Sequence, residues 1–245
     1  MQPHVDRHLP IKGTYNVRDL GGYAAAAGKT RFRRVLRADG LHRLDADGMA
    51  VLVREGVTTV IDLRHPGELV THPNPFGTGE VVHYHNVSLF DRLEPMTQSG
   101  GDQLLELYKL ALAERGAAIA HVLTTIARAP AGAVLFHCTA GKDRTGIVAA
   151  LLLATAGVEV DAIVADYAET GARIAPMVEE IIASATARGT DAEAFRPLLA
   201  SDPATMAATI AHLEAEHGSV RQYLATIGLD DATIDALNAR LLGEA

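Results

Sequence analysis

The chain has 245 residues, of which 48% are hydrophobic and 21% are charged, and its formal net charge is −8. This composition excludes a largely disordered chain, and the length allows one large domain or two small ones. The acidic balance argues against a nucleic-acid-binding protein, because such binding draws on net positive charge. The single cysteine, Cys138, excludes an internal disulfide and a four-thiolate zinc site.

Neither a signal peptide nor a transmembrane segment is predicted. Residues 1–10 lack the apolar core of a signal peptide, so we expect a cytoplasmic protein, with export by another route left open. The most apolar window, residues 147–157, would be about 16 Å long as a helix, whereas the hydrocarbon of a bilayer is about 30 Å thick. We therefore predict that this window is a core helix.

The first half of the chain predicts strands that alternate with helices. Residues 58–63 are β-branched and almost continuously apolar, which is typical of a strand buried on both faces. A helical pattern over residues 104–129 contains Gly116, where we predict a break. The other predicted elements are strands at 34–38, 81–87 and 133–136, a helix at 45–55, and a turn or short strand at 24–27.

From residue 145 onward the sequence predicts only helices. They are expected at 145–156, 160–170, 173–187, 203–216, 220–226 and 231–242. Strands separated by helices imply a mostly parallel sheet that helices cover on both faces. We therefore predict an α/β fold with a helical C-terminal half. No linker or sharp change of composition divides it, so a single domain is expected over residues 1–245.

The segment AVLFHCTAGKDRTG, residues 133–146, carries the strongest chemical signal. A hydrophobic strand ends at the only cysteine, a short loop follows, and an arginine stands where the next helix begins. Backbone N–H groups in such a loop converge on one point, to which the helix dipole adds positive charge, so the segment predicts an oxyanion site. The candidate phosphate-binding residues are Thr139, Ala140, Gly141, Lys142, Asp143 and Arg144.

A thiol at the centre of this site can act as a nucleophile. A lone cysteine after a strand is more often a small buried hydrophobe, but the helix N-terminus and the arginine both stabilise a thiolate, so we predict Cys138 as the nucleophile. The planar fork of Arg144 can bind two non-bridging oxygens of a phosphoryl group. Thr145 is placed to donate its hydroxyl to the sulfur when the sulfur becomes the leaving group.

The sequence from His137 to Thr145 resembles the signature loop of the cysteine-dependent phosphatases, and its form HCTAGKDRTG resembles the bacterial tyrosine/dual-specificity phosphatase family, which is related to the phosphoinositide phosphatases. Residues 137–145 are hereafter the signature loop. Three more segments match that family: NVRDLGG at 16–22, VIDLR at 60–64 with Glu68 after it, and GSVRQYL at 218–224. The resemblance implies a central sheet flanked by helices and hydrolysis of phosphomonoesters through a phosphocysteine, without a metal or another cofactor.

Three aspartates are candidates for the general acid that protonates the leaving group. Asp91 follows the strand predicted at 81–87, about where related phosphatases carry a catalytic aspartate on a loop. Asp143 lies inside the signature loop, at a position where the bacterial family has an aspartate. These two rank equally, whereas Asp62 ranks lower because its neighbour Arg64 predicts a structural ion pair.

The other polar residues have simpler interpretations. His137 is predicted to hydrogen-bond the scaffold, and residues 16–22 are predicted to support the signature loop without touching substrate. Lys142 is either a solvated loop charge or a second positive contact for a polyanionic substrate. We expect a solvated strand face for the arginine cluster and half-exposed side chains without a metal for the paired histidines; these residues are Arg31, Arg33, Arg34, Arg37, His83 and His85.

The predicted function is hydrolysis of phosphotyrosine or another phosphoprotein, with phosphate or another oxyanion in the signature loop. The alternatives are a phosphoinositide phosphatase with the same mechanism and a phosphate-binding module without turnover. Sulfur transfer and arsenate reduction also use a thiolate in an oxyanion loop, but arsenate reduction usually relies on further thiols, which this chain lacks. The helical segment at about 160–217 is longer than a minimal phosphatase needs and contains a candidate lid or insertion.

Overall fold

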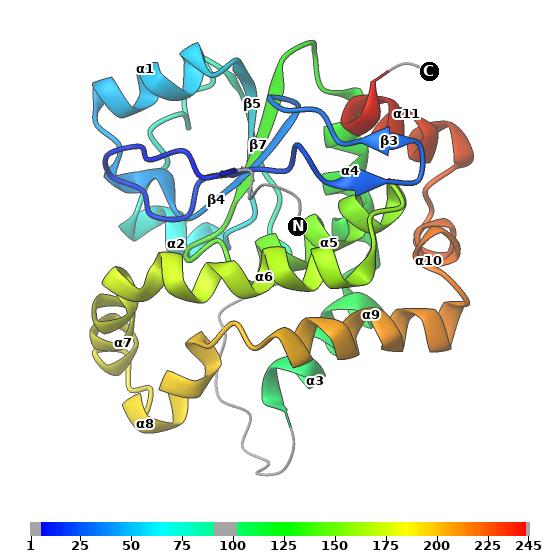
Figure 1. Ribbon diagram of the computed structural model, residues 1–245. Helices are drawn as coiled ribbons and strands as arrows, with labels where there is room; N and C mark the ends of the chain where they lie inside the picture. The colour runs from blue at the N-terminus through cyan, green and yellow to red at the C-terminus, as the bar shows by residue number, and fades with distance from the viewer. Residues whose placement is uncertain (1–5, 91–101, 244–245) are drawn as a thin grey trace.

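The centre of the molecule is a five-stranded sheet in the order β1-β4-β7-β5-β6 (Figure 1). The computed structural model describes residues 6–90 and 102–243. One pairing is antiparallel, and the other three are parallel. The antiparallel pair is β1 (Arg18–Asp19) with β4 (Val35–Ala38), and the parallel strands after β4 are β7 (Ala133–His137), β5 (Val57–Asp62) and β6 (His83–Asn86). The predicted mostly parallel sheet is confirmed.

The strands predicted at 34–38, 58–63, 81–87 and 133–136 are confirmed as β4, β5, β6 and β7. The strand β1 was not anticipated, because it has only two residues and both are charged. Residues 24–27, for which a turn or short strand was expected, contain both: β2 (Ala24–Ala25) pairs with β3 (Gly28–Lys29) in a separate two-stranded sheet, and a turn joins them.

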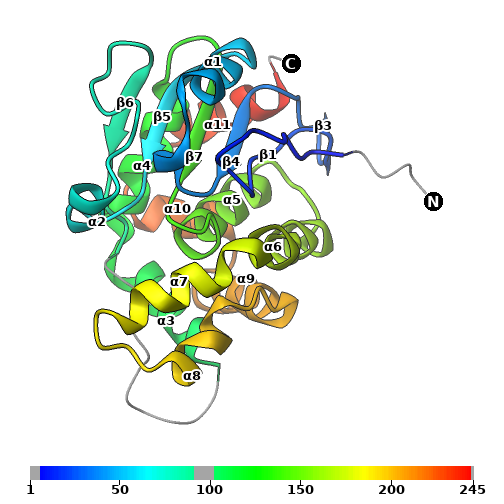
Figure 2. The same cartoon turned by 90° about the vertical axis from the view of Figure 1, so that its left-hand side faces the viewer.

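Both faces of the sheet are covered by helices. Alternate residues of the central strand β7 contribute to two different hydrophobic clusters, as expected for a strand that is buried on both sides. Leu135 belongs to a cluster that includes Leu52 of α1 (Ala46–Arg54). Phe136 belongs to a larger cluster that includes Ile147 and the other buried apolar side chains of α5 (Asp143–Thr155). The prediction that helices cover both faces is confirmed (Figure 2).

In the first half one predicted feature of the helices is confirmed and one helix was not predicted. The predicted break at Gly116 is confirmed, because α3 (Gln103–Glu114) and α4 (Gly116–Arg128) meet at an angle of 78°. The helix α2 (Pro66–Thr71) was missed because it has only six residues. Its start is nevertheless well defined, since His65 and Glu68 form a reciprocal capping box at its N-terminus.

The second half is helical, as predicted, but one boundary is wrong. In place of helices at 160–170 and 173–187, α6 runs from Val160 to Ile174, a 3-10 turn follows at Ala175–Met177, and α7 covers Val178–Thr186. Pro176 explains the break, because it has no N–H to continue the hydrogen-bond ladder of α6. The remaining elements are α8 (Ala192–Phe195), the 3-10 helix η3 (Arg196–Leu199), α9 (Pro203–His217), α10 (Val220–Thr226) and α11 (Asp231–Leu242).

The helix that carries the most apolar window of the sequence lies in the core. Every residue of α5 from Asp143 to Leu153 is buried, which confirms the prediction for residues 147–157. Among the described helices, no single one is both long and apolar enough to cross a bilayer, and α3 with α4 reaches that length only as a bent pair.

Candidate active site

The signature loop joins the C-terminal end of the central strand to the helix that packs beneath the sheet. β7 ends at His137, and α5 begins at Asp143, so Cys138 lies at the carboxyl edge of the parallel strands. Ligands of open α/β sheets bind at this edge. The cysteine is free and only 2% exposed.

Three consecutive carbonyl groups of the loop, those of residues 139–141, accept hydrogen bonds from residues of the segment 16–40. Gly40 N–H donates to the first at 2.9 Å, Asn16 Nδ2 donates to the second and third at 3.1 and 3.2 Å, and Arg37 Nη2 donates to the third at 2.8 Å. In a trans peptide the N–H points opposite to the carbonyl. The N–H groups of residues 140–142 therefore point away from this segment together, which is the arrangement of an oxyanion cradle.

The loop can take this shape only with glycine at position 141. Gly141 has a φ of +66°, and a Cβ there would lie 2.5 Å from the carbonyl oxygen of Ala38. Any other residue would combine left-handed backbone strain with a clash against backbone of β4. The loop can approach β4 this closely because Gly141 has no Cβ.

The motif at residues 16–22 supports the loop, as predicted. Asn16 is fully buried, and its side-chain oxygen accepts a short hydrogen bond from Arg18 Nη1. Arg18 is also fully buried and donates from Nη2 to the Asp166 carbonyl at 2.8 Å and to Thr170 at 3.2 Å. Helix α6 therefore orients Arg18, Arg18 orients Asn16, and Asn16 binds the loop.

The solvated strand face predicted for the arginine cluster is wrong for Arg37. This side chain is buried, and it forms a short ion pair with Asp166 while donating to the loop carbonyl of Gly141. Burial by itself raises the pKa of Asp166, but the charges of Arg37 and Arg18 bring it down to about 2. Two buried guanidinium groups thus face one carboxylate behind the signature loop. The rest of the cluster is more exposed, with Arg34 half-buried and Arg31 and Arg33 exposed.

Arg144 is held in a fixed orientation by a carboxylate on α2. Its Nη1 and Nη2 donate to the two oxygens of Glu68 at 2.6 and 3.0 Å, and Nη2 also donates to Thr139 Oγ1 at 3.2 Å. These bonds use three of the five guanidinium N–H donors and leave two for a bound oxyanion. Although burial alone raises the pKa of Glu68, the bond to Arg144 and the charge of Arg144 lower it to about 2.

Asp143 is the one candidate acid that the structure places inside the loop. Its carboxylate accepts a hydrogen bond from Tyr108 at 2.5 Å and forms an ion pair with Lys142 at 2.9 Å. The Tyr108 hydroxyl is in turn 2.9 Å from that of Tyr167. Asp91 lies outside the described residues, but the ring of Phe90 before it is 5.8 Å from the Arg144 guanidinium.

Asp62 and His137 form a buried network beneath the loop. Arg64 donates to both oxygens of Asp62 at 2.9 and 2.7 Å, which confirms the predicted ion pair. Despite full burial, His137 and Arg64 keep the pKa of Asp62 well below its usual range. His137 places Nδ1 3.1 Å from the Cys138 carbonyl oxygen and Nε2 2.8 Å from Asn74 Nδ2, so its predicted scaffold role is confirmed.

This geometry can be set beside known proteins. The model of the tyrosine phosphatase family matches residues 9–243. The chain belongs to the tyrosine phosphatase family. It is therefore a hydrolase, and the resemblance read from the signature loop is confirmed. A solved structure, the crystal structure of P. aeruginosa TpbA, is similar at 20% identity and a TM-score of 0.33, over 69% of this chain and 88% of that one. No match was found among curated proteins.

In this phosphatase the Lys142 side chain is neither solvated nor free, so the interpretation as a solvated loop charge is wrong. The residue is fully buried, and its ammonium group donates to the carbonyl of Ala200 at 2.9 Å and, at shorter range, to that of Leu198. A contact between this ammonium and a substrate requires it to leave these carbonyls. In the structure the hydrogen bonds of Lys142 connect η3 and the residue after it to the signature loop.

The Thr145 hydroxyl and the paired histidines of the phosphatase have no fixed role in the structure. Thr145 Oγ1 is buried and has no hydrogen-bond partner among the described residues. His83 and His85 are exposed on the edge strand β6. Within residues 6–90 and 102–243, no group of three or more His, Cys, Asp or Glu side chains is arranged to hold a metal ion.

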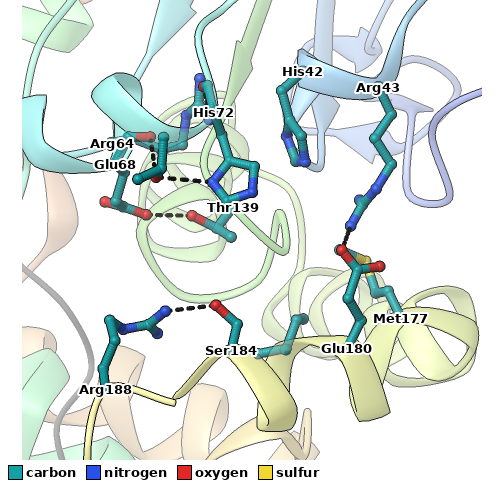
Figure 3. Close-up of a pocket in the computed structure, with 12 residues that line it drawn as sticks. His42, Arg43, Arg64, Glu68, His72, Thr139, Met177, Glu180, Ser184 and Arg188 are labelled. Atoms are coloured by element: carbon teal, nitrogen blue, oxygen red, sulfur yellow. Dashed lines mark hydrogen bonds and ion pairs between the residues drawn. The ribbon is translucent and has the colours of Figure 1, made fainter. Parts of the chain in front are cut away.

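A cavity of about 120 Å³ adjoins the signature loop of the phosphatase (Figure 3). Two of its lining residues, Glu68 and Thr139, are the residues that contact Arg144. Other lining residues come from α7 and from the 3-10 helix η1 (Leu41–Arg43). The cavity therefore lies between the loop, the sheet side of the molecule and the helical C-terminal half.

Sequence reasoning missed the residues that act on the loop from a distance. Asp166 and Tyr167 lie on the buried face of α6, and Tyr108 lies on the buried face of α3. A signal was present for Asp166, because it falls at helical spacing between the apolar Ile163 and the buried Thr170. A carboxylate on the buried face of a helix requires a cationic partner, which here is supplied by arginines of β1 and β4.

Proposed function

We propose that this chain hydrolyses phosphomonoesters, with Cys138 as the nucleophile and a phosphocysteine as the intermediate. The observation that carries the proposal is the set of three loop carbonyls held back by Gly40, Asn16 and Arg37, which turns three N–H groups toward one side. Donors fixed in advance at the place where charge develops are the largest contribution to catalysis in many enzymes.

The reaction follows from the groups around the loop. The Cys138 thiolate attacks phosphorus while the loop amides and the two remaining donors of Arg144 bind the non-bridging oxygens. The bond from phosphorus to the leaving oxygen breaks, and that oxygen takes a proton from the general acid. The general acid, now a carboxylate, takes a proton from the water that attacks the phosphocysteine. The bond from phosphorus to sulfur breaks, phosphate leaves, and the Thr145 hydroxyl donates to the returning thiolate. That hydroxyl is buried and has no hydrogen-bond partner within residues 6–90 and 102–243, which supports this role.

The general acid in this proposal is Asp143 or Asp91. Asp143 lies in the loop beside Lys142 and Tyr108, and Phe90, which precedes Asp91, contacts Arg144. Single Asn substitutions separate the two on a pair of substrates. Loss of the acid slows hydrolysis of phosphoserine, a poor leaving group, far more than that of an aryl phosphate. If the Asp91 variant keeps wild-type turnover on phosphoserine, Asp91 is not the acid.

We propose phosphotyrosine or another phosphoprotein residue as the substrate, with phosphoinositides as the alternative. Family membership supports the first. The arginines Arg43 and Arg188 beside the loop favour a substrate with more than one anionic group, which supports the second. A phosphate-binding module without turnover does not account for a cysteine placed with a clamped Arg144.

Helices α7 and α8, with η3, are proposed as a lid over the site. Ala140 of the loop packs against Ile174 and Met177, and Lys142 binds carbonyls of the η3 segment. Cys138 is only 2% exposed, and the lid is proposed to move when substrate enters. Limited proteolysis with and without phosphate tests the idea, and equal cleavage in both conditions contradicts it.

One experiment tests the proposed function as a whole. Hydrolysis of an aryl phosphate is measured in the presence of EDTA, with Cys138→Ser as the control. We expect full activity of the unaltered chain in EDTA and none in the serine variant. Activity that disappears with EDTA, or that persists in the serine variant, overturns the mechanism.

A further inference from the structure

Two buried tyrosines behind the signature loop have no part in the reaction as proposed above. Tyr108 comes from α3 and Tyr167 from α6, and both side chains are buried. The Tyr108 hydroxyl lies 2.5 Å from Asp143 Oδ1 and 2.9 Å from the Tyr167 hydroxyl. A buried hydroxyl costs free energy unless it is hydrogen-bonded, whereas phenylalanine fills the same space without that cost. The two hydroxyls and the loop carboxylate therefore form a polar chain that packing alone does not require.

The direction of each hydrogen bond in this chain is fixed. Asp143 Oδ1 also lies 2.9 Å from Lys142 Nζ, and an ammonium group only donates, so Oδ1 is an acceptor. Tyr108 therefore donates its single proton to Oδ1 and accepts the proton of Tyr167. Burial and the charge of Asp143 raise the pKa of both tyrosines above its ordinary value, so both hydroxyls keep their protons at neutral pH. The chain runs from Tyr167 through Tyr108 to Asp143.

Both donors to Asp143, the Tyr108 hydroxyl and the Lys142 ammonium, contact the same carboxylate oxygen. An oxygen that accepts hydrogen bonds from an ammonium and a phenol is a poor site for a proton, because such donors bind the ionised form best. Oδ2 is therefore the oxygen of Asp143 that can carry and transfer a proton. The two donors thus decide which of two chemically equivalent oxygens reacts.

Packing fixes the rings of both tyrosines. The rings meet edge to face, with 6.3 Å between centroids and 89° between planes. The Tyr167 ring also lies against α5 at Gly146, where an added Cβ would be 3.0 Å from Cδ2 of the ring. Gly146 is three residues after Asp143, so the two lie on neighbouring parts of the α5 surface. The hydroxyl chain is therefore held against the turn of α5 that carries Asp143.

We propose that Tyr108 is a positioning residue of this phosphatase, that Tyr167 orients it, and that it holds Asp143 so that Oδ2 exchanges protons with the leaving group and with water. The proposal rests on the proposed function, in which Asp143 is one of two candidate acids. It goes beyond that function by assigning roles to two residues outside the signature loop and by naming the reacting oxygen.

The chain of hydroxyls acts on both steps of the reaction. In the first step the bond from Cys138 sulfur to phosphorus forms, the bond from phosphorus to the leaving oxygen breaks, and the proton on Oδ2 passes to that oxygen. The negative charge that develops on the carboxylate is shared with Oδ1, where Tyr108 and Lys142 already donate. In the second step Oδ2 takes a proton from water as the phosphorus–sulfur bond breaks. Tyr108 keeps its proton throughout.

The first test compares two aryl phosphates in Tyr108→Phe. Phenol is a poorer leaving group than 4-nitrophenol, so its departure depends more on a correctly placed acid. We expect kcat/KM for phenyl phosphate to fall about ten-fold, as for loss of one hydrogen bond to a charged group, and that for 4-nitrophenyl phosphate to fall less than about two-fold. Equal losses on the two substrates indicate a general disturbance of the loop and overturn the proposal.

A double-mutant cycle tests whether Tyr108 acts through Asp143. Asp143→Asn should lower kcat/KM for phenyl phosphate about 100-fold or more, and adding Tyr108→Phe should then change it by less than about two-fold. A further ten-fold loss in the Asn background means that Tyr108 acts independently of Asp143, which overturns the proposal. Tyr167→Phe should cost about three-fold, again only when Asp143 is present, and it carries the cycle if Tyr108→Phe does not fold.

Tyr223 provides a matched control on the same helix. Its side chain is also buried, and its hydroxyl donates to the Leu112 carbonyl of α3 at 2.9 Å. Tyr223→Phe therefore removes a buried tyrosine hydrogen bond to α3 without touching Asp143. It should leave the ratio of kcat/KM for the two aryl phosphates unchanged. A shift as large as that of Tyr108→Phe shows that loosening of α3 is sufficient, and the positioning role is refuted.

The same measurements separate this proposal from the proposed function. If neither aryl phosphate is hydrolysed in a Cys138-dependent way, the proposed function has failed. If both are hydrolysed but Asp143→Asn keeps the kcat/KM of the unaltered chain on phenyl phosphate, the acid lies elsewhere, and only the roles of Tyr108, Tyr167 and Oδ2 have failed.

Discussion

Replacing Arg37 with Met removes the buried guanidinium that holds the Gly141 carbonyl while keeping most of the side-chain volume. A hydrogen bond to a charged group contributes about 1.5–3 kcal/mol. Asn16 still donates to the same carbonyl, and Arg18 and Tyr23 still donate to Asp166, so the lower part of this range applies. We expect the free energy of unfolding to fall by about 2 kcal/mol.

The loss of activity should be larger than this loss of stability suggests. Without Arg37, Asn16 is the only described residue that still donates to the carbonyl of the peptide between Gly141 and Lys142, at 3.2 Å. Its N–H is then a poorly oriented donor in the oxyanion cradle. Loss of one such donor lowers kcat about 100-fold, which corresponds to about 2.7 kcal/mol.

The measurements are urea unfolding followed by circular dichroism and hydrolysis of 4-nitrophenyl phosphate at a temperature where the variant is folded. Arg34→Met is the matched control, because Arg34 is only half-buried and contributes no side-chain bond to the loop. It should keep both stability and kcat. A folded Arg37→Met variant with wild-type kcat, or an equal loss in both variants, contradicts the role assigned to the carbonyl contact.

Three further results follow from the same geometry. Gly141→Ala should reduce kcat at least 100-fold, because its Cβ must push the loop away from the Ala38 carbonyl 2.5 Å away; a variant whose initial rate matches the wild type rules this out. Thr145→Val should leave the unfolding free energy within about 0.5 kcal/mol, because the hydroxyl has no partner in the described part of the chain, but should slow release of the thiolate; rapid-quench kinetics should show a larger burst, and an unchanged burst removes Thr145 from the mechanism. The pKa of Glu68 is about 2 in the folded chain, below its ordinary 4.5, so its contribution is complete above about pH 5 and is lost as the pH falls toward 2. As the pH falls over this range, the free energy of unfolding should decrease by about 3 kcal/mol less in Glu68→Gln than in the wild type. If the free energy of unfolding depends on pH in the same way in both proteins, the ion pair is contradicted.

The sequence predicts the structure best where that structure depends on residues that are close together in the sequence. The central strand β7, the break at Gly116 and the position of Cys138 between a strand and a helix all follow from local patterns of apolar residues and glycine. The signature loop is predictable for the same reason, since its nucleophile, amides and arginine are consecutive. Its Gly141 is needed by a backbone conformation that no other residue adopts without strain.

The sequence predictions are wrong where the burial and contacts of a residue depend on a partner that is distant in the sequence. Arg37 looks like one of a run of solvated arginines, and only the fold brings it to Asp166, 129 positions away. Lys142 looks like a loop charge, but its ammonium meets carbonyls that are 56 and 58 positions away. No local pattern records these contacts. Where the buried face of a helix includes a carboxylate, as at Asp166, the sequence does predict that a cationic side chain pairs with it, but not which one.

The order of the strands has a consequence for biosynthesis. β7, which ends one residue before Cys138, is the last of the described strands to be made and yet occupies the middle of the sheet, between β4 and β5. Until it leaves the ribosome, both neighbours present an unpaired edge, which is a template for association with other chains. The side chains behind the loop are completed later still, with α6. A nascent or truncated chain that stops before this helix is therefore expected to need chaperone protection, and an active N-terminal fragment should not be obtainable.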